Sequence, residues 1–178
     1  MSLIKMDESA TNLPVRHIRK NDGDARRLLG GLMSVKISTA ETQGQFCLCE
    51  GLIVPNMAVP LHRHPDVEAF IVLDGSLDVF RVTDGKPESV RVQAGEMALI
   101  PSNAVHGFCN RSARDVRILT LCTAGLQAFF EEASIPVEGS QCTEIEPPKP
   151  EEIERVLAIA RKHGQVFVDN GGPAHAAF

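Results

Sequence analysis

The stretch that decides the fold is residues 60–68, with the sequence Pro60-Leu61-His62-Arg63-His64-Pro65-Asp66-Val67-Glu68. Alternate residues of a β-strand point to the same face, so His62 and His64 would project both imidazoles to one side. Pro65-Asp66 has the composition of a turn, which would let Glu68 approach the same point from the next strand. The segment therefore predicts three converging polar side chains held by strands.

A later segment supplies a fourth candidate ligand. Gly95 is followed by Pro101-Ser102-Asn103 and then by His106. Three imidazoles and one carboxylate form a mixed nitrogen and oxygen set that suits Fe, Mn, Ni, Co, Cu or Zn, and the lack of a thiolate ligand argues against a structural zinc site. We therefore predict one divalent transition metal ion, with positions open to water, substrate or dioxygen. Its predicted ligands are His62, His64, Glu68 and His106.

The grouping of these residues sets them apart from ordinary histidines. An isolated histidine is most often a packed or surface residue, and we interpret His17, His163 and His175 in that way. Three of the six histidines, together with Glu68, fall in the strand-rich centre of the chain. The H-x-H-x3-E-x6-G string alone should arise by chance in fewer than about one chain in a thousand.

Between Leu32 and Cys122, short segments rich in β-forming residues alternate with turn-forming residues, as is typical of β-structure. Asp74-Gly75, Asp84-Gly85 and Asn110-Arg111-Ser112 are the expected hairpin points. No helix-length segment separates the runs, which favours a closed antiparallel β-barrel or jelly roll of the all-β class over β-α-β winding. The expected strands are 33–38, 45–54, 67–73, 76–82, 88–92, 97–100, 105–109 and 115–122.

The chain divides into three expected parts. Residues 1–32 are polar and charge-rich and predict a loosely held N-terminal arm, residues 33–124 predict the barrel, and residues 125–178 predict C-terminal helices and a tail packed on it. Apolar residues spaced three and four apart indicate the helices, one beginning at Gly125 and one running from Glu151 to His163.

Composition excludes several classes of function. The 178 residues are 43% apolar, enough for one core, and the net charge of −5 provides no broad basic surface for nucleic acid. The sequence has no apolar run of membrane-spanning length and no signal-peptide pattern at its start, so we expect a cytoplasmic protein that does not engage a membrane. Five cysteines without C-x-x-C spacing predict reduced thiols, with Cys47 and Cys49 as small buried residues.

The two histidine segments resemble the motifs of the cupin superfamily, G-x5-H-x-H-x3-4-E-x6-G and G-x5-P-x-G-x2-H-x3-N. The resemblance covers Asn56 to Asn110 and implies the β-barrel of that superfamily, with metal ligands at the four positions named above. Asn56 and Asn103 stand where the motifs have glycine. Asparagine is the residue other than glycine that best tolerates positive φ, so we expect both turns to be kept.

A larger part of the chain resembles small single-domain cupins similar to quercetin 2,3-dioxygenase. The features that carry this resemblance are Glu50-Gly51, the helix expected over 125–132, and Lys162-His163-Gly164 at the end of the second helix. The resemblance implies a metal-dependent dioxygenase acting on a small, flat, aromatic or enol substrate, with Glu68 as the general base. It also implies a homodimer, because exposed strand edges tend to be paired.

The strand pattern also predicts the pocket beside the metal. Phe70 and Val72 share parity with Glu68, and Phe108 shares parity with His106, so these three side chains should line a mostly apolar substrate pocket. Ordinary barrel core is the alternative interpretation of all three. Two other functions stay open at this point: a metal-dependent binding or sensor protein without turnover, and a sugar isomerase or epimerase, which would need more polar groups facing inward.

Overall fold

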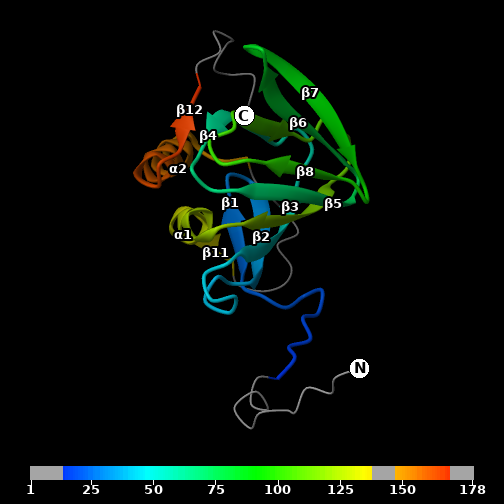
Figure 1. Ribbon diagram of the computed structural model, residues 1–178, viewed down its shortest axis with the longest axis vertical. Coiled ribbons are helices and arrows are strands. Elements are labelled where there is room, and N and C mark those ends of the chain that lie inside the picture. The colour runs from blue at the N-terminus through cyan, green and yellow to red at the C-terminus, as the bar shows by residue number, and fades with distance from the viewer. Residues whose placement is uncertain (1–13, 138–146, 169–178) are drawn as a thin grey trace, which may run out of the picture.

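The protein folds into two antiparallel sheets with two helices at one end, as the computed structural model in Figure 1 shows. The structure describes residues 14–137 and 147–168. The larger sheet has the order β11 (Ile135–Pro136), β1 (Ala25–Leu28), β2 (Gly31–Ile37), β3 (Cys47–Ile53), β10 (Val116–Cys122), β5 (Glu68–Asp74), β8 (Met97–Ile100). The smaller has the order β12 (Val166–Phe167), β4 (Ala58–Arg63), β9 (His106–Cys109), β6 (Ser76–Thr83), β7 (Lys86–Gln93). The all-β jelly-roll prediction is confirmed.

The eight expected strands are all present, with bounds that differ by at most two residues from the predicted ones. Alternation explains this agreement, because β5 and β10 bury every second side chain along their length. The inward residues of these strands form the barrel core with residues of β6, and the core includes Phe70, Val72, Leu77, Val116 and Ile118.

Two of the three expected hairpins are wrong. Asp84-Gly85 does join the paired strands β6 and β7, and both residues have positive φ, 51° and 74°. Asp74-Gly75 instead connects β5 of the larger sheet to β6 of the smaller, and residues 110–112 likewise connect β9 to β10. In a jelly roll the chain crosses between sheets at such points, so a turn signal marks a reversal without identifying the strand that pairs.

The helices pack over one end of the barrel and form a second core there. α1 (Ala124–Ala133) and α2 (Pro150–Lys162) lie together on the left of Figure 1, and both contact buried cysteines of β3 and β10. Cys47 and Cys49 are 0% and 2% exposed, which confirms their prediction as buried small residues. The members of this cluster are Cys47, Cys49, Cys122, Leu126, Phe129, Ala133, Val156 and Ala160.

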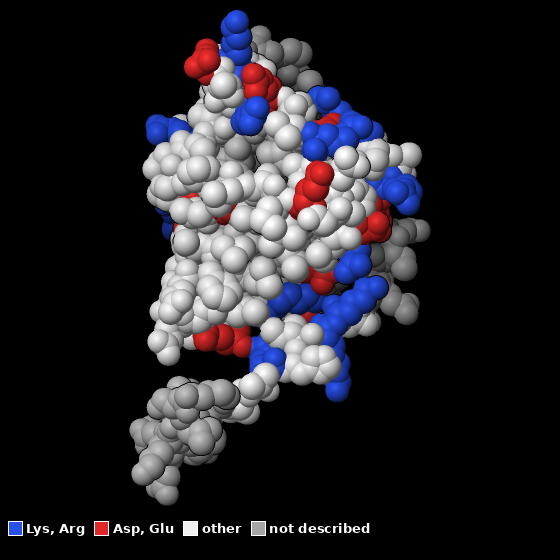
Figure 2. Space-filling model, turned by 45° about the vertical axis from the view of Figure 1, so that its right-hand side comes forward, with Lys and Arg blue, Asp and Glu red and all other residues white. Residues whose placement is uncertain are grey.

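The segment expected to be an arm contributes to the larger sheet. β1 lies within residues 1–32 and pairs with both β2 and β11. The Arg26 Nε atom donates a hydrogen bond to Ser134 Oγ at 2.6 Å, which ties this strand to the end of α1. Residues 1–13, the predicted C-terminal tail from Gly171 and Cys142 lie outside the described residues. Neither described helix has the length and apolar character needed to cross a membrane. The middle of the surface drawn in Figure 2 carries few charged side chains.

Candidate metal centre

The four predicted ligands lie at the ends of strands that face each other across the barrel. His62 lies in β4, His64 lies just after that strand, Glu68 begins β5 and His106 begins β9. His62 and His106 are register partners in the smaller sheet, whereas Glu68 belongs to the larger one. The turn between His64 and Glu68 therefore carries the chain from one sheet to the other.

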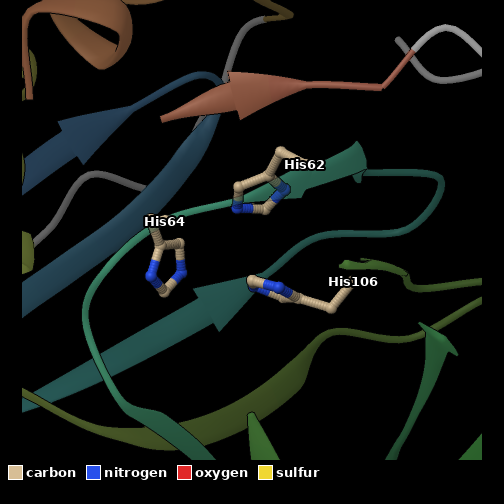
Figure 3. A group of neighbouring side chains, drawn as sticks. All are labelled: His62, His64 and His106. Atoms are coloured by element: carbon tan, nitrogen blue, oxygen red, sulfur yellow. The ribbon is translucent and has the colours of Figure 1, made fainter. Parts of the chain in front are cut away.

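The three imidazole rings converge on one point. Figure 3 shows the rings of His62, His64 and His106 turned toward one another. One ring nitrogen from each lies within 4.8 Å of the others, and all three side chains are buried. The shortest distance between ring centroids is 4.3 Å, from His62 to His106. Such a buried three-histidine cluster is consistent with one metal ion.

Backbone hydrogen bonds orient each ring for this purpose. The Nδ1 atoms of His62, His64 and His106 lie 2.9, 3.1 and 3.0 Å from the carbonyl oxygens of Pro60, Asp66 and Ala104. A carbonyl oxygen only accepts, so each Nδ1 donates a proton and each neutral ring keeps its lone pair on Nε2. This is the arrangement in which a second hydrogen bond fixes the tautomer of a metal ligand.

The Nε2 atoms of His64 and His106 are buried and make no hydrogen bond of good geometry. Each lies near Glu68 Oε2, at 3.4 and 3.3 Å. A buried nitrogen whose hydrogen-bonding capacity is poorly met costs free energy, which coordination to a metal ion would recover. The lone pairs, their convergence and their burial fit a divalent transition metal ion.

Glu68 lies to one side of the histidine cluster. Its Oε2 atom is 3.3 Å from His106 Nε2 and 3.4 Å from His64 Nε2, and its side chain is 6% exposed. In the described part of the chain, the group of ligand atoms within 4.8 Å of one another consists of the three histidines alone. The structure therefore brings all four predicted residues together, with Glu68 positioned next to the nitrogen ligands.

Burial and charge set opposite pKa directions within the cluster. Burial disfavours the His62 imidazolium and, with the nearby His106, lowers the His62 pKa to about 4. Burial also disfavours the charged forms of His64 and Glu68, but attraction between the carboxylate and the imidazoles outweighs burial. The His64 pKa is therefore raised by Glu68, and the Glu68 pKa is lowered by His106 and His64. Without a metal, a neutral His62 adjoins an ion-paired carboxylate.

The two asparagines that replace motif glycines occupy left-handed turns, as predicted. Asn56 and Asn103 have φ values of 64° and 62°. The Asn103 backbone N–H donates to the His64 carbonyl oxygen at 2.8 Å, which links the turn before His106 to the first histidine segment. Asn110, fully buried, donates from Nδ2 to the Ile53 carbonyl oxygen at 2.8 Å. Hydrogen bonding between the two segments thus holds the motif residues in their relative positions.

The predicted pocket residues divide into two groups. Phe70 and Phe108 line a cavity of about 140 Å³ beside the histidines and meet edge to face, with ring centroids 5.3 Å apart. Val72 is 1% exposed and packs in the barrel core without lining this cavity. Val72 lies further along β5, away from the end where Glu68 meets the histidines, so parity placed it inside the barrel but not in the pocket.

Sequence reasoning missed the elements that close the cavity. Strands β1 and β2, both helices and the segment after α2 also line it, so the cavity extends from the histidines out to the second core. β12 pairs with β4, and the Phe167 ring lies 5.8 Å from the His62 ring. No spacing signal indicates these contacts, because they join residues about a hundred positions apart.

A jelly roll that holds a buried histidine cluster is typical of small metal-binding barrels, and comparison with known sequence families gives a related result. The family described as "Cupin domain" matches residues 52–122, the segment that contains all four predicted ligands. This part of the chain is therefore similar to the domain of the cupin superfamily. No curated protein sequence matches the chain.

Solved structures similar to this chain are diverse cupin-like proteins. A recombinant oxalate oxidase in complex with glycolate is 24% identical, with a TM-score of 0.46 over 54% of this chain and 52% of its own, so this chain spans about half its length. The polyketide cyclase RemF from Streptomyces resistomycificus is 25% identical, with a TM-score of 0.53 over 62% of this chain and 80% of its own. A predicted oxalate decarboxylase from Thermotoga maritima is 20% identical, with a TM-score of 0.53 over 61% and 98%.

Proposed function

We propose that this protein is a metal-dependent dioxygenase, similar to quercetin 2,3-dioxygenase, that acts on a neutral, flat and largely apolar substrate with an enol or phenol hydroxyl. The observation that carries the proposal is the histidine cluster opening into an apolar cavity that includes Phe70 and Phe108. An apolar cavity with a few convergent polar groups is the usual form of a small-molecule site.

The charge of the cavity wall supports a neutral substrate. Among the described residues that line the cavity, the charged side chains are Glu50 and Glu68, and none is Lys or Arg. None of these residues offers a cation to a small dianion such as oxalate, so the metal ion alone would have to offset the cost of removing both charges from water. A flat aromatic molecule has a small desolvation cost on entering the same cavity, because its surface is mostly apolar.

Each residue of the site has a role in the proposed reaction. A bound metal ion would act as a Lewis acid that lowers the pKa of a substrate hydroxyl. Glu68 would accept that proton, because its lowered pKa keeps it ionised and its Oε2 atom lies beside the ligand nitrogens. Phe70 and Phe108 would hold the substrate ring and exclude water. Overall, the substrate and one O2 molecule combine, with both oxygen atoms entering the product.

Oxygen uptake tests the proposal directly. The metal-loaded protein is mixed with a panel of flavonols, catechols and β-diketones, and dissolved O2 is followed with an electrode. We expect uptake with at least one compound and a loss of roughly a hundredfold or more in Glu68→Gln with metal retained, because general-base catalysis contributes about 10²–10⁴-fold. No uptake with any compound, or equal turnover in Glu68→Gln, would contradict the proposal.

A cyclisation without oxygen is the second candidate. It is supported by the similarity to the polyketide cyclase RemF, whose name describes action on polyketides, and it would use the same Glu68 as base. Sugar isomerisation is a weaker alternative, because an apolar wall has few groups to hold a sugar. Binding without turnover is the remaining alternative. Mass analysis of each panel compound after incubation under ¹⁸O2 distinguishes them. Products that together contain two ¹⁸O atoms support the dioxygenase, and an unlabelled isomeric or dehydrated product supports the alternatives.

A further inference from the structure

Gln165 is a buried polar residue that the fold leaves unused. It lies between α2 and β12, is 6% exposed and lines the cavity. Its backbone N–H donates to the Ala160 carbonyl oxygen at 2.9 Å, but its carboxamide makes no hydrogen bond to any of the described residues. The described residues therefore leave the donor and acceptor atoms of this carboxamide available to a ligand in the cavity.

Strand alternation places this side chain on the cavity side. Val166 is 46% exposed and points outward, whereas Gln165 and Phe167 on either side of it both line the cavity. Thr120 is a second polar residue on the wall, 7% exposed, with Cys49 and Phe70 as register partners. Its hydroxyl makes no hydrogen bond to the described residues either.

We propose that Gln165, assisted by Thr120, is a specificity-determining residue that hydrogen-bonds a carbonyl or hydroxyl group of a neutral aromatic ligand. This inference deepens the proposed function, since it concerns the ligand of the same cavity. A carboxamide both donates and accepts, so it matches either group, while the lack of Lys and Arg on the wall disfavours a carboxylate or phosphate. A site built to hydrogen-bond a ligand group rejects the analogue that lacks it.

The test uses p-cresol and p-xylene, which share a shape and differ in one hydroxyl. The cavity of about 140 Å³ suits them, since an apolar cavity of about 150 Å³ binds benzene. Both are titrated into the metal-free protein, and binding is followed by NMR of methyl groups on the cavity wall, such as those of Leu126 and Val156, which every variant keeps. Working without metal separates this inference from the reaction: selective binding without oxygen uptake would keep the inference and refute only the proposed function.

Gln165→Leu is the diagnostic variant, with Gln45→Leu, at an exposed position outside the cavity wall, as its control. We expect Gln165→Leu to weaken p-cresol binding by roughly five- to tenfold and to leave p-xylene binding unchanged or tighter, because one neutral hydrogen bond is lost. Thr120→Val should give a smaller loss of the same kind. Unchanged p-cresol binding in Gln165→Leu, equal losses for both compounds, or no binding of either by the native protein would overturn the proposal.

Discussion

His64→Ala should abolish metal binding, because this residue supplies one of the three converging imidazole nitrogens. The His64 Nε2 atom is buried, lacks a hydrogen-bond partner and lies within 4.8 Å of the corresponding atoms of His62 and His106. Removing it leaves two imidazoles and Glu68 around a small void, and no other described histidine is close enough to replace it.

The magnitude follows from mass action on folding. A metal present at about one hundred times its dissociation constant stabilises the folded state by about 2.7 kcal/mol. For a chain of 178 residues, each kcal/mol raises Tm by roughly 2–4 °C. The native protein should therefore gain roughly 5–11 °C on adding its metal, whereas His64→Ala should gain close to none at the same concentration.

Thermal unfolding followed by circular dichroism is the suitable assay, since the chain has no Trp or Tyr to report fluorescence. The protein is stripped with a chelator and then supplied in turn with Fe, Mn, Ni, Co, Cu and Zn, with elemental analysis of each sample. His17→Ala, at an exposed position away from the cluster, is the control and should keep the full shift. An equal Tm gain in His64→Ala, or no gain in the native protein with any of these metals, would refute the reasoning.

Three further predictions concern the same site. In the metal-free protein, the His62 ring should titrate near pH 4 by NMR, because burial favours its neutral form; a midpoint near 6.5 would contradict this. Gly107→Ala should lower both Tm and metal affinity, since its Cβ would lie 2.7 Å from the Val59 carbonyl oxygen and displace β9, at about 1–3 kcal/mol of unfolding free energy; an unchanged Tm would count against it. Phe70→Ala should cost about 3–5 kcal/mol in denaturant unfolding, and a loss below 1 kcal/mol would show that the ring is not core.

The ligand set was accessible from the sequence because its geometry is mostly local. His62 and His64 share a face through strand alternation, and the turn between His64 and Glu68 is short enough to read directly. The same holds for Asn56 and Asn103, whose positive φ follows from the side chain's tolerance of that region. His106 was the one distant member, and its motif spacing identified it.

Strand pairing was not accessible in the same way. Asp74-Gly75 signals a reversal in either arrangement, since the positive φ of Gly75 serves a hairpin and a crossing between sheets equally well. What decides between them is how the two sheets stack, and that depends on burial of both faces together.

The sequence by itself therefore determined eight of the twelve described strands, the fold class and the four residues that meet at the centre, because periods of two and short turns act over a few residues. Only the tertiary structure decided what encloses that centre. The contact of Phe167 with His62 and the place of Gln165 on the cavity wall both join residues far apart in the chain. Their proximity results from packing the whole core at once, and no local pattern encodes it.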